Sequence, residues 1–185
     1  MSIDGCIAGP NNEMDWLFPD DDVMPNNDVL QYIHNIAESV DTIIMGRKMV
    51  DGFIPYWTEV ANKPNDPWNA FAKKMIEIPK IVFTKTLIKS NWINTEIEKG
   101  DLKDEITKLK SQDGKDILVY GGASFDSSLI KEKLIDDFYL LVNPLIMGNG
   151  KNIFKDLKEI QKLTLIESKV LDSSTVLLHY EVKKN

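Results

Sequence analysis

The fold is decided by the stretch Asp116-Ile117-Leu118-Val119-Tyr120-Gly121-Gly122-Ala123-Ser124-Phe125. Its apolar residues 117–120 predict a short strand that is buried on both faces. The two glycines let the backbone turn sharply, and residues 123–132 have the apolar spacing of a helix. Such a turn brings backbone N–H groups and the positive end of a helix to one point, which suits a phosphate. A tight turn that only needs small residues would explain the glycines equally well.

Length and composition predict a single domain, residues 1–185, in a reducing compartment. The chain has 185 residues, of which 43% are hydrophobic, and this is enough for one sizeable core. Cys6 is the only cysteine, so we expect no disulfide and a cytoplasmic protein. No signal-peptide pattern or membrane-spanning apolar run is present. The net charge of -7 argues against nucleic acid as a partner, and the two histidines lack the spacing of a metal site.

A second strand-to-helix turn carries the only arginine of the chain. Residues 42–45 are apolar enough for a buried strand, and Gly46, Arg47 and Lys48 follow it directly. Of the 22 basic residues all but Arg47 are lysines, so the one planar, bidentate anion binder stands at a helix start. A surface arginine without a special role is the alternative, and we favour the phosphate contact.

Predicted strands and helices alternate along the first two-thirds of the chain, and a β meander follows. Helices are predicted at residues 28–40, 67–77 and 101–111, and further strands at 79–85, 92–97, 136–142, 162–171 and 174–183. Residues 50–70, with Pro55, Pro64 and Pro67, predict an irregular segment. Residues 4–27, with the acidic run Asp20–Asp22, predict a long ordered loop with a functional role.

This order predicts an α/β fold with one mixed, mostly parallel central sheet, flanking helices and a C-terminal antiparallel hairpin. Ligands of such sheets bind outside the carboxyl ends of the parallel strands. Three strand ends carry groups suited to phosphate: Gly46-Arg47-Lys48, Thr84-Lys85 and Gly121-Gly122-Ala123-Ser124. Because neither a P-loop nor a GxGxxG motif is present, a two-phosphate cofactor laid across several strand ends explains the pattern best.

Several motifs, in the same order, resemble the dihydrofolate-reductase-like proteins. They are Ser2–Pro10 with Glu13-Met14-Asp15-Trp16, then Ile44–Arg47, Val119–Gly122, and Pro144–Gly150 with Ile153-Phe154. They are most similar to the reductase domain of the bifunctional riboflavin-biosynthesis deaminase-reductase and to its small single-domain relatives. The resemblance covers nearly the whole chain and implies a three-layer dihydrofolate-reductase-like fold, NADPH as cofactor and a homodimer.

The resemblance also implies which residues hold NADPH. Gly46 and Arg47 would hold its adenosine side, with Arg47 near the 2′-phosphate and Lys48 at the same strand end. Thr84 and Lys85 would flank that region. The pyrophosphate would lie on Gly121, Gly122, Ala123 and Ser124, and the nicotinamide near Ala8 and Gly9.

On the substrate side, the resemblance assigns the catalytic position to Asp4. Its carboxylate would face the substrate and either bind it or help to protonate it. A simple cap of the turn before Gly5 is the alternative. Asp15 and Trp16 would close over the substrate, and a solvent-facing Asp15 with a core Trp16 is the alternative there.

The resemblance therefore implies an NADPH-dependent reductase, similar to dihydrofolate reductase or to 5-amino-6-(5-phosphoribosylamino)uracil reductase. It would transfer a hydride to a pteridine, a pyrimidine or a similar heterocycle. A nucleotide-binding module with little or no turnover is the alternative. The apolar strand that normally precedes the Ser-x-Asp-Gly motif is almost absent here, which bears on catalysis more than on cofactor binding. We expect no attached deaminase domain, so a riboflavin precursor does not follow as the substrate.

Overall fold

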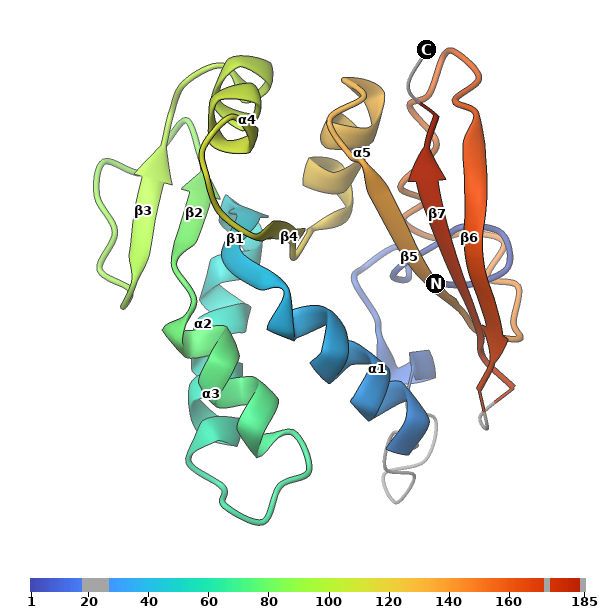
Figure 1. The fold of residues 1–185 in the computed structure, drawn as a ribbon, viewed down its shortest axis with the longest axis horizontal. Coiled ribbons are helices and arrows are strands. Elements are labelled where there is room, and N and C mark those ends of the chain that lie inside the picture. Colours follow the sequence, from blue (N-terminus) through green and yellow to red (C-terminus); the bar gives the residue numbers. More distant parts are fainter. Residues whose placement is uncertain (18–26, 172–173, 184–185) are drawn as a thin grey trace. The chain divides into compact units, whose positions relative to one another are not determined.

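The computed structural model describes residues 1–17, 27–171 and 174–183 (Figure 1). Most of the predicted loop at residues 4–27, including Asp20–Asp22, and part of the predicted hairpin turn, residues 172–173, lie outside the described residues. The chain forms two compact units, one of Met1–Leu30 with Asp126–Asn185 and the other of Gln31–Phe125. Each unit is described by itself below, and the single domain predicted from the sequence stays a prediction.

A parallel four-stranded sheet is the centre of the unit Gln31–Phe125. Its strands have the order β3-β2-β1-β4, and every neighbouring pair is parallel. They are β1 (Val40–Gly46), β2 (Lys80–Phe83), β3 (Thr95–Glu98) and β4 (Asp116–Val119). Ile43, Met45 and Val82 are completely buried in this sheet, as the continuous apolar runs predict. The carboxyl ends of all four strands therefore lie at one edge.

Helices flank this sheet, and one of them replaces a segment that the sequence predicts as irregular. They are α1 (Asn27–Glu38, whose first residues belong to the other unit), α2 (Arg47–Ala61), α3 (Asn69–Glu77) and α4 (Leu102–Lys110). Helix α2 continues through Pro55, so the prediction of an irregular segment over 50–70 is wrong for its first half. The lost hydrogen bond at the proline is outweighed because Phe53, Trp57 and Val60 are buried at helical spacing.

The unit Met1–Leu30 with Asp126–Asn185 contains an antiparallel sheet of order β5-β7-β6. Its strands are β5 (Asp137–Val142), β6 (Leu163–Val170) and β7 (Val176–Val182). The N-terminal residues run beside β5, where the Met1 amino group donates to the carbonyl of Leu141 at 2.6 Å. Residues 1–8 form turns and one isolated β-bridge instead of a strand. This agrees with the sequence, in which the apolar strand before the Ser-x-Asp-Gly motif is almost absent. Helix α5 (Ala123–Lys131) crosses the boundary between the two units.

The predicted α/β class is confirmed, with parallel strands, flanking helices and a C-terminal antiparallel hairpin (Figure 1). The strands pair in two sheets, whereas the sequence predicts one mixed sheet. The difference arises because β4 and β5 have no pairing with each other among the described strands. No helix in the described part of the chain combines the length and the apolarity needed to cross a membrane.

Candidate functional site

Two predicted phosphate-binding turns are joined at the carboxyl edge of the parallel sheet. Strand β1 lies beside β4, and the N–H of Gly46 donates to the carbonyl of Gly121 at 3.1 Å. Helix α2 begins at Arg47 and α5 begins at Ala123, so both helix N-termini follow directly on the joined strand ends. The structure therefore brings Gly46, Arg47 and the Gly-Gly turn together, as the strand order predicts.

The glycines of this edge are required by backbone conformation and by space. Gly121 and Gly122 have positive φ values of 76° and 59°, which L side chains rarely adopt. A Cβ atom on Gly122 would lie 3.3 Å from Cγ of Met49, and one on Gly46 would lie 3.0 Å from Cβ of Phe125. The glycines therefore allow Met49 and Phe125 to pack closely against this edge, and the backbone N–H groups at a helix N-terminus are donors of the kind that bind a phosphate.

Arg47 is held in place by two neighbours that the sequence does not single out. Its Nη1 donates to the carboxylate of Asp51 at 2.6 Å, and its guanidinium carbon lies 5.5 Å from the ring centre of Trp92. The ion pair is solvent-exposed and weak, but stacking on a ring together with an ion pair fixes the direction of the guanidinium. Trp92 belongs to a stretch predicted as a weak strand, and only its aromatic character could have pointed to this contact.

Thr84 and Lys85 lie at the end of β2, but their side chains already have partners within the protein. The Thr84 hydroxyl accepts from the N–H groups of Thr86 and Leu87 at 3.1 and 3.3 Å, which closes a turn. Lys85 Nζ donates to the carbonyls of Lys99 and Gly100 at 2.6 and 2.9 Å. Both side chains thus stabilise the loops at this edge. To contact a phosphate, either side chain has to share its present hydrogen bonds or give them up.

The remaining predicted cofactor residues of this edge lie where the sequence places them. Lys48 is exposed in the first turn of α2, and Ala123 and Ser124 are the first two residues of α5. Behind them, Tyr120 is half-buried and accepts from Trp57 Nε1 at 3.2 Å, and desolvation of its phenol raises the pKa to about 12. The neutral phenol and the rings around it form a rigid base for the edge.

Asp4, in the other unit, anchors the glycine-rich turn that follows β5. Its two carboxylate oxygens accept from the backbone N–H groups of Met147 and Gly148 at 3.0 and 2.8 Å. These bonds, that of Met147 first, lower the pKa of Asp4 to about 2. The Asp4 carbonyl also accepts from Asn152 Nδ2 at 2.7 Å. A carboxylate of such low pKa suits the binding of a substrate donor better than the delivery of a proton near neutral pH.

Ala8 and Gly9 lie beside the same glycine-rich segment. The Ala8 carbonyl accepts from the N–H of Lys151 at 2.8 Å, and a Cβ atom on Gly150 would lie 2.8 Å from that carbonyl oxygen. The N–H of Gly9 donates to the carbonyl of Glu13 at 2.9 Å, and a Cβ atom there would collide with the Glu13 side chain. The small residues are therefore needed for the close approach of these backbone segments.

Asp15 and Trp16 form a short 3-10 turn, η1 (Asp15–Leu17), that follows these residues. Asp15 is exposed and accepts from the N–H of Trp16 at 3.1 Å. Trp16 is half-buried, and its indole N–H donates to the carbonyl of Glu13 at 3.2 Å. Asp15 is therefore exposed to solvent. Trp16 is only half-buried, so it does not belong to the core.

The predicted site residues thus divide into two groups in two units. Asp4, Ala8, Gly9, Asp15 and Trp16 belong to the unit with the antiparallel sheet. All the residues predicted at the strand ends belong to the unit with the parallel sheet, namely Gly46, Arg47, Lys48, Thr84, Lys85, Gly121, Gly122, Ala123 and Ser124.

The hydrogen bonds that Asp4 accepts predict that the protein loses stability in acid. Because the folded-state pKa is about 2 and the ordinary value is 3.8, the stabilisation by Asp4 is present above pH 4 and is lost as the pH falls from 4 towards 2. We expect Asp4→Asn to be less stable than the wild type at pH 6, with a difference that narrows towards pH 3. Urea unfolding at both pH values measures this. The exposed Asp113→Asn is the control, and a difference that is equal at both pH values contradicts the assignment.

Similar proteins agree with the fold. The RibD C-terminal domain family matches residues 1–177. The chain is 33% identical over 188 residues to "Uncharacterized protein YyaP" of Bacillus subtilis, an alignment that covers 97% of this chain and 90% of YyaP. A candidate riboflavin biosynthesis protein from a Shewanella species has a similar structure, with a TM-score of 0.70, 24% identity and coverage of 100% of this chain and 96% of that one.

A longer protein contains a similar fold over about half of its length. The diaminohydroxyphosphoribosylaminopyrimidine deaminase/5-amino-6-(5-phosphoribosylamino)uracil reductase of Thermotoga maritima matches with a TM-score of 0.66 and 18% identity. The alignment covers 98% of this chain and 54% of that protein, so this chain spans about half its length. The family match over nearly the whole sequence, together with the relative in Bacillus, shows that the chain belongs to the RibD C-terminal domain family.

Proposed function

We propose that the protein is an NADPH-dependent reductase that acts on a pteridine, a pyrimidine or a similar nitrogen heterocycle. The observation that carries the proposal is the joined edge of β1 and β4, where Arg47 and the turn at Gly121-Gly122 lie at two helix N-termini. A cationic, planar side chain and bare backbone N–H groups are the donors that the phosphates of such a cofactor need.

The residues of this edge fit NADPH, because space and charge are both provided. Gly122 places no side chain at this turn, and we assign the pyrophosphate to the turn and to Ala123 and Ser124. We assign the 2′-phosphate to Arg47, with Lys48 as a second cation. Thr84 and Lys85 flank this region through the loops that they hold.

When bound, the reduced nicotinamide supplies the hydride, and the protein has to position the substrate and exclude water. We assign Ala8 and Gly9 to the nicotinamide side on the resemblance of the motif Ser2–Pro10 to the family. Asp4 would bind an N–H group of the substrate through a carboxylate that stays ionised at neutral pH. Asp15 and Trp16 would cover the substrate, with the half-buried indole as the contact surface.

Two structural relatives carry descriptions that name a substrate class. The Thermotoga maritima protein is described as a 5-amino-6-(5-phosphoribosylamino)uracil reductase, and a similar structure from Corynebacterium diphtheriae is described as a pyrimidine reductase-like protein. Both descriptions concern reduction and a pyrimidine. We propose the broader class of nitrogen heterocycles for this chain, because the identities to those two structures, 18% and 12%, carry the fold alone.

A nucleotide-binding module with little turnover is a second candidate, and the geometry of Asp4 favours it. Both carboxylate oxygens accept from backbone N–H groups, so Asp4 has a structural role in holding Met147 and Gly148 that needs no substrate. This candidate predicts that NADPH binds and is not oxidised by any pterin or aminouracil. Loss of reduced-nicotinamide absorbance with such a compound would exclude it.

Replacing Arg47 by Ala tests the cofactor. We expect the wild type to bind NADPH more tightly than NADH, and Arg47→Ala to lose about tenfold or more in NADPH affinity with little change for NADH, because only NADPH carries the 2′-phosphate. Titration calorimetry with both nucleotides measures this. The exposed Lys73→Ala, which removes one positive charge elsewhere, should behave as the wild type. If neither nucleotide binds the wild type, the reductase proposal has to be abandoned.

We also propose a homodimer in a reducing, cytoplasmic compartment. The edge strand β6 leaves Leu165, Ile166 and Val170 exposed, and a second copy of the chain would cover such apolar side chains. Light scattering after size exclusion decides the oligomeric state.

A further inference from the structure

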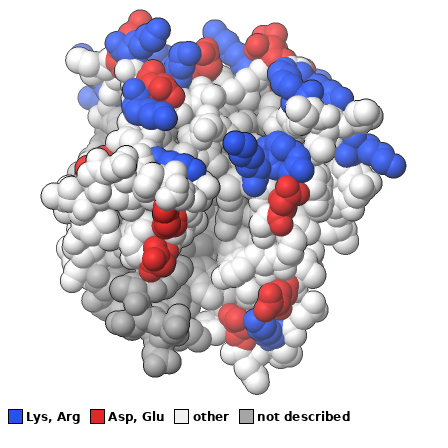
Figure 2. Space-filling view, turned by 180° about the vertical axis from the view of Figure 1, so that it is seen from behind, with Lys and Arg blue, Asp and Glu red and all other residues white. Residues whose placement is uncertain are grey.

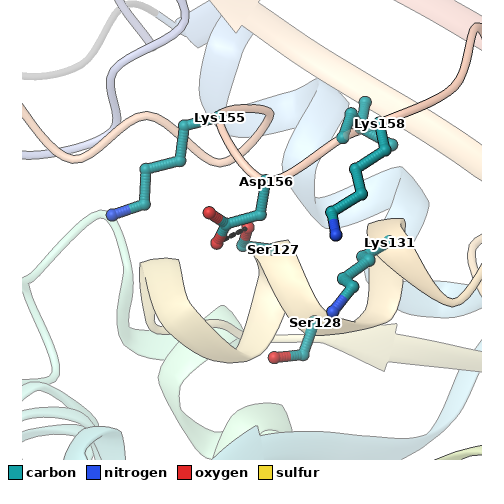
Figure 3. A pocket seen from close by; sticks show the side chains of 7 residues that line it. Ser127, Ser128, Lys131, Lys155, Asp156 and Lys158 are labelled. Atoms are coloured by element: carbon teal, nitrogen blue, oxygen red, sulfur yellow. Dashed lines mark hydrogen bonds between the residues drawn. The ribbon is translucent and has the colours of Figure 1, made fainter.

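A pocket of about 320 Å³ lies along the second half of α5, and none of the described residues that line it is assigned to the cofactor (Figure 3). Helix α5 contributes Ser127, Ser128 and Lys131, and the segment after the glycine-rich turn contributes Lys155, Asp156 and Lys158. Both walls belong to one compact unit, Met1–Leu30 with Asp126–Asn185. The volume is at the lower end of the range of small-ligand sites in proteins.

The second wall is fastened to α5 and to the residues that follow it. Ser127 Oγ donates to Asp156 Oδ2 at 3.0 Å on the floor of the pocket. Lys133 forms an ion pair with Glu159 at 2.9 Å, and Gln161 Nε2 donates to the carbonyl of Ile130 at 2.8 Å. Three contacts in succession hold the segment 156–161 along the helix, so the pocket is a built feature of this unit.

The charges around the pocket are mostly positive. Three lysines and one carboxylate line the pocket, and that carboxylate already accepts from Ser127. In Figure 3 the ammonium groups of Lys131 and Lys158 extend towards the same side of the pocket, near Ser128. Among the described residues, none of the three lysines forms an ion pair with an acidic side chain. Lys131 lies in the last turn of α5, where a positive charge interacts favourably with the negative end of the helix dipole. Lys155 and Lys158 lie outside α5, so the helix dipole does not explain their positive charges.

We propose that this pocket binds a phosphate group, either free or as the terminal group of a small phosphorylated metabolite. The ammonium groups of Lys131 and Lys158 beside a concave surface are suited to a compact dianion, because each is a charged donor at short range. The protein is acidic overall, with a net charge of -7, yet lysine and arginine side chains gather in patches on the face drawn in Figure 2. A local cluster can therefore attract an anion to an acidic protein.

The test is a titration of the full chain with inorganic phosphate and with glycerol 3-phosphate at low ionic strength. Calorimetry and amide NMR shifts of residues 127–131 and 155–158 follow the binding, with sodium chloride and sulfate at matched ionic strength for comparison. We expect saturable binding of phosphate, and a loss of about tenfold in Lys131→Ala/Lys158→Ala because two charges are removed at short range. Tighter binding of the ester identifies a metabolite as the source, and equal binding identifies free phosphate.

Two further variants make the result specific to the pocket. Lys162→Ala removes an exposed lysine of the same unit outside the pocket and should bind phosphate as the wild type does. Asp156→Asn keeps an oxygen for Ser127 but removes the only negative charge of the lining, so it should tighten binding about threefold or more. NADPH affinity should be unchanged in all of them, which separates this proposal from the cofactor site. Absence of saturable binding, or equal binding by the double variant and Lys162→Ala, would overturn the proposal.

Discussion

Replacing Asp126 by Asn should raise the free energy of unfolding at pH 8 by about 2–4 kcal/mol. Asp126 lies in the first turn of α5, and its Oδ1 is a buried oxygen without a hydrogen-bond partner among the described residues. Burial raises the pKa of this carboxyl from 3.8 to about 7. The charge is therefore a cost to the folded state wherever Asp126 is ionised.

The sign of the pH dependence follows from this raised pKa. Between pH 4 and pH 7 the folded state binds more protons at Asp126 than the unfolded state, so this group makes the protein less stable as the pH rises through that window. Above pH 7 the cost is constant. The positive end of α5 favours the charge by about 0.3–1 kcal/mol, which is too little to offset a shift of about three pH units.

Urea unfolding of wild type and Asp126→Asn at pH 8, 6 and 4 checks this prediction. The stabilisation should be largest at pH 8 and should shrink steadily towards pH 4, because the protonated acid and the amide are both neutral. Asp104→Asn is a matched control, since Asp104 is an exposed aspartate in the first turn of α4. A stabilisation that does not depend on pH, or no stabilisation at pH 8, contradicts the proposed burial of a charge.

Replacing Gly122 by Val should destabilise the protein by about 2–4 kcal/mol and abolish NADPH binding. A β-branched side chain is strained at a φ of 59°, and its Cβ would press against Met49 at 3.3 Å. The same side chain would fill the space assigned to the pyrophosphate. Thermal unfolding and nucleotide titration of the variant measure the two effects.

Two other variants separate strain from the loss of the cofactor. Gly148 has a φ of 70° and open space around it, so Gly148→Val should show the strain alone, about 1–2 kcal/mol. Gly122→Asn should fold, because asparagine tolerates a positive φ. It should still lose NADPH affinity, because its side chain enters the space assigned to the pyrophosphate. Unchanged affinity in a folded Gly122→Asn would remove the pyrophosphate from this turn.

Local sequence patterns were sufficient to predict most of the helices and strands, and the residues at one edge of the candidate site. Apolar runs predicted β1, β2 and β4, because a strand buried on both faces needs no alternation. The glycine pair predicted the turn into α5, since only glycine adopts positive φ without strain. The solitary Arg47 was located at a helix start because it directly follows the apolar run of β1 and Gly46, at which that strand ends. The parallel order of strands then required their ends to share an edge.

Partners that are distant in the sequence could not be predicted from it. Asp4 binds amides 143 and 144 residues away, and these bonds, together with its low pKa, favour a binding role over proton donation. Lys80 is 1% exposed, with its ammonium group bonded to the carbonyls of Ile76 and Ile78, although lysine is almost never a core residue. The helix through Pro55 likewise depends on burial of its apolar face.

The sequence by itself determined the α/β class, most of the order of the elements and the strand ends at which Gly46, Arg47, Gly121 and Gly122 stand. These follow from periodicity and from backbone conformation, which are set by neighbouring residues. Only the tertiary structure decided what each polar group does. The ammonium group of Lys85 donates to a loop carbonyl of the protein itself. The pocket beside Lys131 forms from two segments that are separate in the chain. Hydrogen bonds, burial and charge clusters depend on contacts that exist only after the chain has folded.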